Sequence, residues 1–317
     1  MRNLILNFQN HINEGYELGL KNKLAKECTN YVISGIGGSS APGEIFWMLT
    51  NEQDLDKWPK VYINRDFDLP GWIDASDIAI CISWSGATEE TLSSLNTAIA
   101  KNIPAVVISK GGKLIEIAKQ NNIPFVDLDD DSFPARFGVG YTLGALLGVL
   151  DINPNIVTID HETLEKEGQD IANKIGHKIP VIYTAYHWRK LANFWKTLFN
   201  ENAKIPAFWN AFPLLNHNEL ESLGKSKDTL YPIIIRSNDD DPRQIKSIDA
   251  TIAILDKLGY NYSIVNISTS GSLLQRIMSN YILGLWASFY LANILGVDPI
   301  ETPTINDFKQ FKLNLSK

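Results

Sequence analysis

Alternation of short apolar runs with helix-like segments is the feature that most constrains how this chain folds. Between residues 31 and 150 we expect strands at 31–35, 61–64, 78–83, 105–109 and 125–128. Helical patterns lie near residues 44–49, 89–101, 113–121 and 138–150. Strands that alternate with helices predict βαβ units, and therefore a parallel sheet with helices on both of its faces.

The same alternation starts again after the linker-like residues 151–155, Asp-Ile-Asn-Pro-Asn. Here we expect strands at 179–185, 203–208, 230–236 and 262–267, and helices at 162–173, 188–200, 243–258 and 273–295. A chain of 317 residues is long enough for two domains. The sequence therefore predicts an α/β protein of two αβα sandwich domains, residues 1–153 and 154–317, each with a mainly parallel central sheet.

Two glycine- and serine-rich loops follow expected strands in the first half. One is G-I-G-G-S-S at residues 35–40, and the other is S-W-S-G-A-T at residues 83–88. In a parallel sheet both loops open at the same edge, where glycines, hydroxyls and helix N-termini together bind anions. Neither loop contains a lysine, so the pair predicts a site for a phosphate monoester rather than a P-loop for a nucleoside triphosphate.

Two other interpretations of these loops stay open at this point. Each loop taken alone is as typical of a purely structural turn as of a phosphate-binding loop. A dinucleotide-binding fingerprint is the other alternative, because Asp66 ends the next expected strand. Against it, Ser40 stands where the third glycine belongs, Pro42 falls at the start of the helix, and the second loop would have no role.

Composition narrows the class of protein. The net charge is −7, and no run of Lys and Arg offsets it, so we expect no nucleic-acid partner. Cys28 and Cys81 are the only cysteines and lack metal-ligand spacing, and Cys81 lies in an apolar run that suits a buried, reduced thiol. The N-terminus shows no apolar signal segment. These features predict a cytoplasmic protein.

Residues 277–297 form a stretch of 21 residues without a charge, which is long enough to span a bilayer. The stretch contains two serines and two asparagines, and it would be a lone span late in an otherwise soluble chain. A helix that is apolar on all sides is also typical of a core. We therefore expect no membrane partner, and a helix buried in the core or at a subunit interface.

Polar side chains with potential chemistry gather between residues 200 and 221. Glu201 lies at a helix-to-strand boundary before an aromatic run, where partial desolvation would raise the pKa of its carboxyl toward that of a general base. A surface or capping glutamate is the alternative. His217 has amide and carboxylate residues as its neighbours in the sequence. The second histidine or cysteine that a metal site usually requires is not nearby in the sequence. An acid/base histidine is the better interpretation.

These motifs resemble the bifunctional phosphoglucose/phosphomannose isomerases, a branch of the sugar isomerase (SIS) family. The matching motifs are G-x-G-G-S at 35–39, S-x-S-G-x-T-E-E-T at 83–91, P-x-R-x-x-x-G-Y at 134–141, N-E-N-A-K-x-P-A-F-W at 200–209 and L-N-H-N-E at 215–219. Serine loops occur throughout SIS proteins, whereas N-E-N-A-K with N-H-N-E marks this branch. Single-function phosphoglucose isomerases are much longer.

The resemblance implies two SIS domains, a homodimer with shared active sites, and no cofactor or metal. The reaction would interconvert glucose 6-phosphate, and mannose 6-phosphate, with fructose 6-phosphate through a cis-enediol. Glu201 would be the base, and His217, reaching in from the partner subunit, would assist ring opening. The other site residues implied are Ser39, Ser83, Ser85 and Thr88 for the phosphate, and Gly38 and Arg136 for the sugar near its reacting carbons.

The family also places a threonine and a lysine near the C-terminus. Thr302 and Thr304 are both candidates for the threonine, which is associated with accepting both C2 epimers, and Lys309 is the candidate lysine. Arg136 is sensible on physical grounds, because a fixed cation stabilises charge on the enediol oxygens, although a surface salt bridge is its ordinary role.

Two alternatives within the SIS family remain to be weighed. A non-catalytic sugar-phosphate sensor would usually carry a DNA-binding helix-turn-helix, and the segment before residue 31 is too short and not basic enough. The isomerase half of an aminosugar synthase would need a glutaminase domain with an N-terminal cysteine, and the chain begins Met-Arg-Asn.

Overall fold

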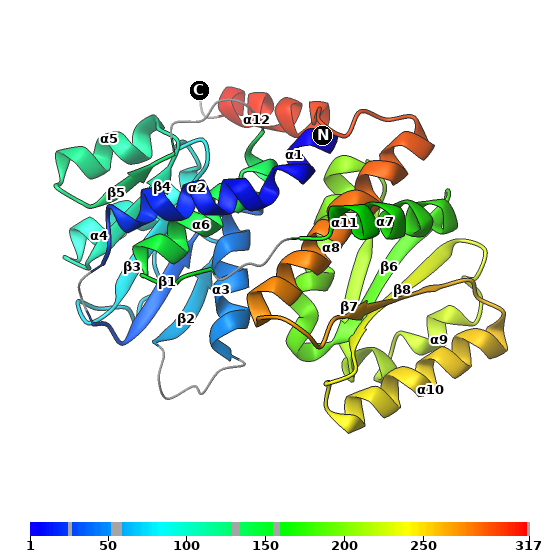
Figure 1. Ribbon diagram of the computed structural model, residues 1–317. Coiled ribbons are helices and arrows are strands. Elements are labelled where there is room, and N and C mark those ends of the chain that lie inside the picture. The colour runs from blue at the N-terminus through cyan, green and yellow to red at the C-terminus, as the bar shows by residue number, and fades with distance from the viewer. Residues whose placement is uncertain (25–26, 52–58, 129–133, 155–158, 316–317) are drawn as a thin grey trace. The chain divides into compact units, whose positions relative to one another are not determined.

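The computed structural model describes residues 1–24, 27–51, 59–128, 134–154 and 159–315 (Figure 1). The chain divides into two compact units. The N-terminal unit comprises Asn3–Ile159 and Gly271–Gln275, and the C-terminal unit comprises Met1–Arg2, Asp160–Ser270 and Arg276–Lys317. Each unit contains one parallel sheet, which confirms the predicted α/β class. The domain boundary after residue 153 stays a prediction; it adjoins residues 155–158, which lie outside the described residues.

The sheet of the N-terminal unit has five parallel strands in the order β2-β1-β3-β4-β5. The strands are β1 (Asn30–Ser34), β2 (Lys60–Asn64), β3 (Ile78–Ile82), β4 (Ala105–Ser109) and β5 (Phe125–Asp127). Every strand expected in this half is present. The strand order reverses between β1 and β3, and open α/β sheets bind ligands at the carboxyl ends of the strands beside such a reversal.

Helices cover both faces of this sheet (Figure 1). α4 (Glu89–Ala100) and α5 (Gly112–Gln120) pack on one face, in a core that includes Val32, Cys81 and Val107. α3 (Ala41–Asn51) packs on β2, and α6 (Val139–Val149) packs on β4. Cys81 is fully buried, as predicted, and burial raises the pKa of its thiol to about 12.

Two N-terminal helices, α1 (Arg2–Leu6) and α2 (Phe8–Leu20), were not expected from the sequence. α2 packs on α6 so closely that glycines are required on both helices. A Cβ at Gly15 would lie 2.1 Å from the carbonyl oxygen of Tyr141, and one at Gly144 would lie 2.0 Å from that of Ile12. The glycines one turn further along each helix meet in the same way. The two backbones are therefore in direct contact along this stripe.

The sheet of the C-terminal unit has four parallel strands in the order β7-β6-β8-β9. The strands are β6 (Ile179–Ala185), β7 (Phe208–Phe212), β8 (Leu230–Ser237) and β9 (Ser263–Ile267). The helices are α7 (His161–Ile175), α8 (Arg189–Asn202), α9 (Leu220–Leu223), α10 (Pro242–Leu258), α11 (Leu273–Leu295) and α12 (Pro303–Leu315). One prediction was wrong, because the strand expected at 203–208 begins only at Phe208. Lys204 has a left-handed backbone (φ 55°) and Pro206 lacks an N–H, so neither suits a paired strand.

Most of the long uncharged stretch near the C-terminus, residues 277–295, lies in α11 and is largely buried in the C-terminal unit. Trp195 Nε1 of α8 donates to both the carbonyl and the side-chain oxygen of Asn280 at 3.1 Å. Asn202 Nδ2 donates to Ser288 Oγ at 2.9 Å. Asn280 and Ser288 thus connect α11 to α8 within a protein core, which confirms the predicted buried helix. Within the described residues, no helix is long and apolar enough to cross a membrane.

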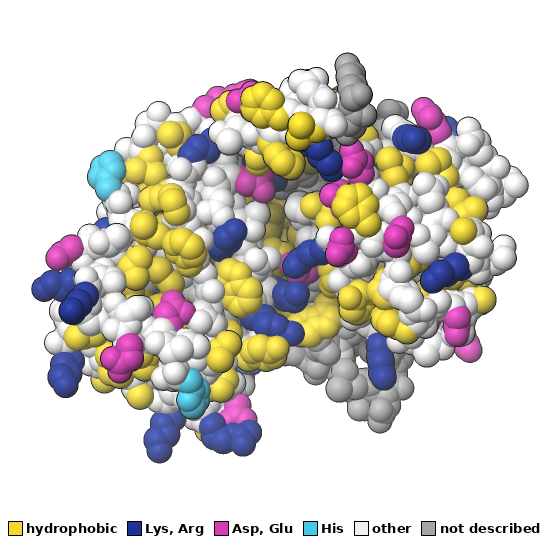
Figure 2. Space-filling view, turned by 180° about the vertical axis from the view of Figure 1, so that it is seen from behind, with side chains coloured by type: hydrophobic (Ala, Val, Ile, Leu, Met, Phe, Trp, Pro, Cys, Tyr) yellow, Lys and Arg dark blue, Asp and Glu magenta, His cyan; other side chains and the backbone are white. Residues whose placement is uncertain are grey.

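The surface carries charges of both signs. On the face drawn in Figure 2, basic and acidic side chains are interspersed rather than gathered by sign.

Candidate active site

The two serine-rich loops meet at the strand-order reversal of the N-terminal unit. β1 and β3 are neighbours, with Ser34 opposite Cys81 near their carboxyl ends, so both loops leave the same edge of the sheet. The backbone N–H of Trp84, in the second loop, donates to Ser39 Oγ, in the first loop, at 3.1 Å. The expected meeting of the loops at one edge is confirmed.

The second loop places hydroxyls at the start of α4. Gly86 has a left-handed backbone (φ 64°), and a Cβ there would lie 1.9 Å from the carbonyl oxygen of Gly111, so the turn requires glycine. The hydroxyl oxygens of Ser83 and Thr88 lie 2.9 Å apart in a hydrogen bond. Ser83 is buried, whereas the Ser85 side chain is exposed. Hydroxyls at a helix N-terminus are suited to bind a phosphate.

Gly38 and Arg136 lie against each other beside these loops. A Cβ at Gly38 would lie 3.1 Å from the Cα of Arg136, so the first loop touches the backbone of the 3-10 turn Ala135–Phe137. The Arg136 guanidinium carbon lies 4.8 Å from the centre of the Phe137 ring. The N-terminal unit therefore brings together the predicted Gly38, Ser39 and Arg136.

Trp84 is a residue of this site to which sequence reasoning gave no role. Its side chain is buried, and a Cβ at Gly138 would lie 2.3 Å from the indole ring. Because Trp84 also bonds Ser39, one residue contacts both the first loop and the start of α6, two residues after Arg136. The sequence signal for this contact was Gly138, which lies between Arg136 and the glycine of the P-x-R-x-x-x-G-Y motif.

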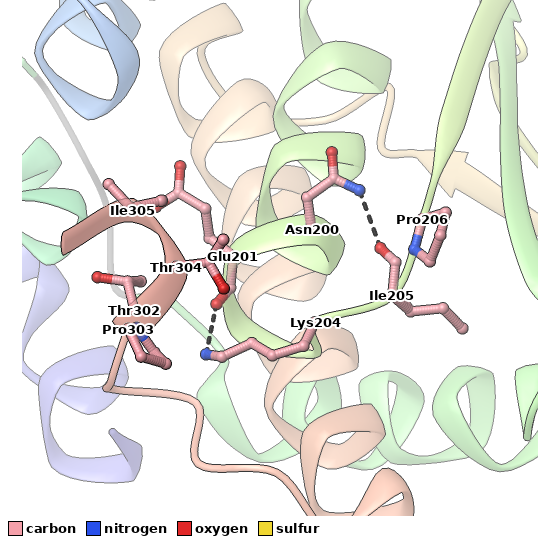
Figure 3. A pocket seen from close by; sticks show the side chains of 9 residues that line it. All are labelled: Asn200, Glu201, Lys204, Ile205, Pro206, Thr302, Pro303, Thr304 and Ile305. Carbon is pink, nitrogen blue, oxygen red and sulfur yellow. Dashed lines mark hydrogen bonds between the residues drawn. The ribbon is translucent and has the colours of Figure 1, made fainter. Parts of the chain in front are cut away.

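Glu201 lies in the last turn of α8, in the C-terminal unit. α8 returns the chain from the carboxyl end of β6 to the amino end of β7, so Glu201 lies at the amino edge of this sheet. It is half-buried and lines a cavity of about 350 Å³ (Figure 3). The other lining residues are Asn200, Lys204, Ile205, Pro206, Thr302, Pro303, Thr304 and Ile305.

Both candidate threonines, Thr302 and Thr304, line the cavity of Glu201, and Lys309 is exposed on α12 outside its lining. Tyr281 of α11 is buried nearby: burial, with the charge of Glu201 as a smaller cause, raises the pKa of the Tyr281 phenol. That phenol therefore stays protonated beside the carboxylate.

His217 ends the 3-10 turn Leu214–His217 and is exposed. It lines a second cavity of about 380 Å³, with Asn216, Asn218, Leu220, Glu221, Gly224, Ile254 and Leu258. Glu219 anchors this loop, because it accepts hydrogen bonds from Tyr183 OH at 2.8 Å and Asn210 Nδ2 at 2.6 Å. Within the described part of one chain, His217 and Glu201 line different cavities.

The carboxyl edge of the C-terminal sheet is filled by the chain itself. The buried Asp240 carboxylate accepts from the backbone N–H of Ser237 and from Trp188 Nε1, both at 2.9 Å, and lies 3.1 Å from His187 Nε2. An internal carboxylate thus binds the Ser237 and Trp188 donors at this edge. The described residues contain no group of His, Cys, Asp and Glu arranged to hold a metal ion.

Comparison with known proteins identifies the family. Residues 164–311 match the model of the bacterial phospho-glucose isomerase C-terminal SIS domain. The chain is 31% identical over 304 residues to a bifunctional phosphoglucose/phosphomannose isomerase of Aquifex aeolicus, covering 90% of this chain and 92% of that protein. The chain belongs to the bifunctional phosphoglucose/phosphomannose isomerase family.

Another isomerase and an epimerase are also similar to the chain. The isomerase of the same name from Thermoplasma volcanium is 32% identical, with 97% of each chain covered. A D-glucosamine-6-phosphate 4-epimerase of Sulfolobus acidocaldarius is 27% identical, with 89% of this chain and 88% of that protein covered.

Solved structures show the same fold. A hypothetical protein from Thermus thermophilus has a TM-score of 0.74 at 12% identity, with 98% of this chain and 90% of that chain covered. The C-terminal domain of the Francisella tularensis glucosamine-fructose-6-phosphate aminotransferase has a TM-score of 0.67 at 15% identity, with 94% of this chain and 98% of that chain covered. Membership in the isomerase family decides against the dinucleotide-binding alternative. Asp66, the residue that suggested this alternative, accepts a hydrogen bond from the N–H of Phe67 at 2.8 Å.

Proposed function

We propose that this member of the phosphoglucose/phosphomannose isomerase family interconverts glucose 6-phosphate and mannose 6-phosphate with fructose 6-phosphate. One observation carries the proposal: two lysine-free hydroxyl loops meet at the strand-order reversal, on a chain that matches isomerases of this name over most of its length. Neutral donors at a helix N-terminus suit a phosphate monoester.

In this proposal, the N-terminal unit binds the phosphate and the sugar. Ser39, Ser83, Ser85 and Thr88 donate to the phosphate oxygens, as their place around the start of α4 supports. The Arg136 guanidinium, next to Gly38, stabilises negative charge on the enediol oxygens.

Glu201 is assigned the proton transfer. Its carboxylate removes the proton from C2 of the aldose as O1 gains a proton, which forms the cis-enediol. It then returns the proton to C1 as the O2 hydroxyl loses its proton, which gives the ketose. Protonation from either face of C2 in the reverse reaction gives glucose or mannose 6-phosphate. Thr302 lines the same cavity as Glu201, so we assign it a contact to the C2 substituent of the substrate. Lys309, on α12, is assigned a further contact to the substrate.

A second copy of the chain completes the site in this proposal. His217 assists ring opening, and we assign it to the neighbouring subunit because it is exposed and lines a cavity without Glu201. α12 supports a homodimer, since its apolar side chains Phe308 and Phe311 are 64% and 67% exposed. The proposal includes a cytoplasmic location, which the buried thiol of Cys81 supports.

The decisive experiment follows each hexose 6-phosphate by NMR with wild type, Glu201→Gln and the control Glu116→Gln, which changes an exposed glutamate of α5. Glu201→Gln keeps the shape and removes the basic oxygen, so kcat should fall by about 10²-fold or more with little change in KM. The control should match wild type.

Three outcomes would contradict parts of the proposal. Near wild-type turnover of Glu201→Gln would remove Glu201 from the mechanism. Binding of hexose 6-phosphates by the wild type without turnover would show a non-catalytic sugar-phosphate sensor. Conversion of glucosamine 6-phosphate at C4, without isomerisation of the hexose 6-phosphates, would place the chain with the epimerase relative.

A further inference from the structure

Lys204 places a cation in the same cavity as Glu201 (Figure 3). It follows the end of α8 at Asn202 by two residues, and its side chain turns back along the open end of the helix. Lys204 Nζ donates to the carbonyl oxygen of Glu201 at 2.6 Å and lies 3.4 Å from that of Asn202.

The backbone of Lys204 is in a conformation that lysine rarely adopts. Its φ is 55°, in the left-handed region that helix ends usually fill with glycine or asparagine. This conformation is less favourable for lysine than for glycine, because the lysine Cβ approaches the following carbonyl oxygen. Strained positions of this kind occur at functional sites, and the Lys204 side chain, unlike glycine, supplies a charge at this helix end.

Electrostatics suggest that role. The last turn of a helix carries a partial negative charge, and Glu201 lies in that turn of α8, so the helix end opposes ionisation of its carboxyl. The Lys204 cation at the same carbonyls offsets this field. Among the described residues that line the cavity, Lys204 is the one cation, and the described segment that leads into α12 contributes Thr302, Pro303, Thr304 and Ile305. From α11, the protonated phenol of Tyr281 faces Glu201.

We propose that Lys204 is a positioning residue that keeps Glu201 ionised, and therefore active as a base, at the acidic end of the working pH range. The inference rests on the proposed isomerase function only for its kinetic consequence. The charge of Lys204, rather than its hydrogen bond to the helix end, carries the effect.

The test compares Lys204→Met, which keeps length without charge, with Lys204→Arg, which keeps the charge. Because Lys204 Nζ lies on the main-chain carbonyls of the helix end, its removal should raise the pKa of the Glu201 carboxyl by about half a unit, as for a charge at a helix end. The acid limb of kcat/KM against pH should therefore move up by about half a pH unit in Lys204→Met and stay near wild type in Lys204→Arg. Lys178→Met is the matched control, because Lys178 Nζ also donates to a carbonyl, that of Lys227 at 2.8 Å, outside the cavity lining.

A second measurement separates this inference from the proposed function. The titration of Glu201, assigned by comparison with Glu201→Gln, is followed by carbon NMR of the labelled carboxyls without substrate. A higher midpoint in Lys204→Met supports the inference even for a protein that shows no isomerase activity. An unchanged midpoint, with a lower melting temperature in both Lys204→Met and Lys178→Met, would show that Lys204 only caps the helix.

Discussion

Replacing Ser85 and Thr88 by alanine, singly and together, tests whether the second loop binds phosphate. Ser85 is exposed, and within the described residues its Oγ takes part in one long hydrogen bond, accepted from the N–H of Ala87 at 3.3 Å. Its loss should leave stability unchanged. A hydrogen bond to a charged oxygen contributes about 1.5 to 3 kcal/mol, so KM for the hexose 6-phosphate should rise by about 10- to 150-fold in Ser85→Ala.

Thr88→Ala should behave differently, because Thr88 has a structural partner. Its hydroxyl bonds Ser83 Oγ at 2.9 Å, and Ser83 is only 1% exposed, so the substitution removes a partner from a buried hydroxyl. We expect a loss of about 1 to 3 kcal/mol in unfolding free energy in addition to the rise in KM. The double variant should combine both rises in KM to about 10² to 10⁴-fold.

Steady-state kinetics to saturating substrate and urea unfolding together measure these two effects. A folded double variant with wild-type KM would refute the phosphate role of this loop. Equal stability losses in Ser85→Ala and Thr88→Ala would refute the hydrogen-bond assignment on which the magnitudes rest.

Three further predictions follow from other parts of the structure. Inactive His217→Ala dimers mixed with inactive Glu201→Gln dimers should recover about a quarter of wild-type activity after subunit exchange, because half of the dimers are then hybrids and each hybrid has one of its two sites intact. No recovery, with subunit exchange confirmed by mass spectrometry, would place both residues in one subunit's site. The hydrogen bond from Arg243 lowers the pKa of Asp241 to about 2, so this interaction contributes stability in full above about pH 3.9 and loses it as the pH falls toward 2. Carbon NMR should show the Asp241 titration moving up in Arg243→Ala; an unmoved titration would assign the shift to another group. Asp240→Ala should cost about 2 to 5 kcal/mol in urea unfolding, because buried donors of Trp188 and Ser237 lose their acceptor, and a near-neutral result would contradict the assigned network.

Sequence reasoning succeeded where a local pattern decides the structure. The apolar runs that become β1, β3 and β4 are buried strands of a parallel sheet, and their pattern does not depend on distant residues. The serine loops were placed correctly for the same reason, because any loop that follows a parallel strand opens at the carboxyl edge.

Tertiary contacts decided what sequence reasoning missed. The packing of α2 rests on Gly15 and Gly19, and the meaning of two glycines at this spacing depends on α6, the helix that they contact. The roles of Trp84 and Lys204 depend on which backbone groups fold next to them. The strand start at Phe208 was misplaced because the apolar residues before it belong to the turn that carries Lys204.

The glycine stripe between α2 and α6 reverses a common rule of protein engineering. Alanine in place of glycine usually stabilises a helix by up to about 1 kcal/mol, so propensity-based design would choose Gly15 and Gly144 early. Here each added methyl would overlap a carbonyl oxygen of the facing helix and force the two apart. Because α6 begins two residues after Phe137, which ends the turn that carries Arg136, a shift of α6 caused by either substitution would also displace the arginine that we propose to bind the sugar.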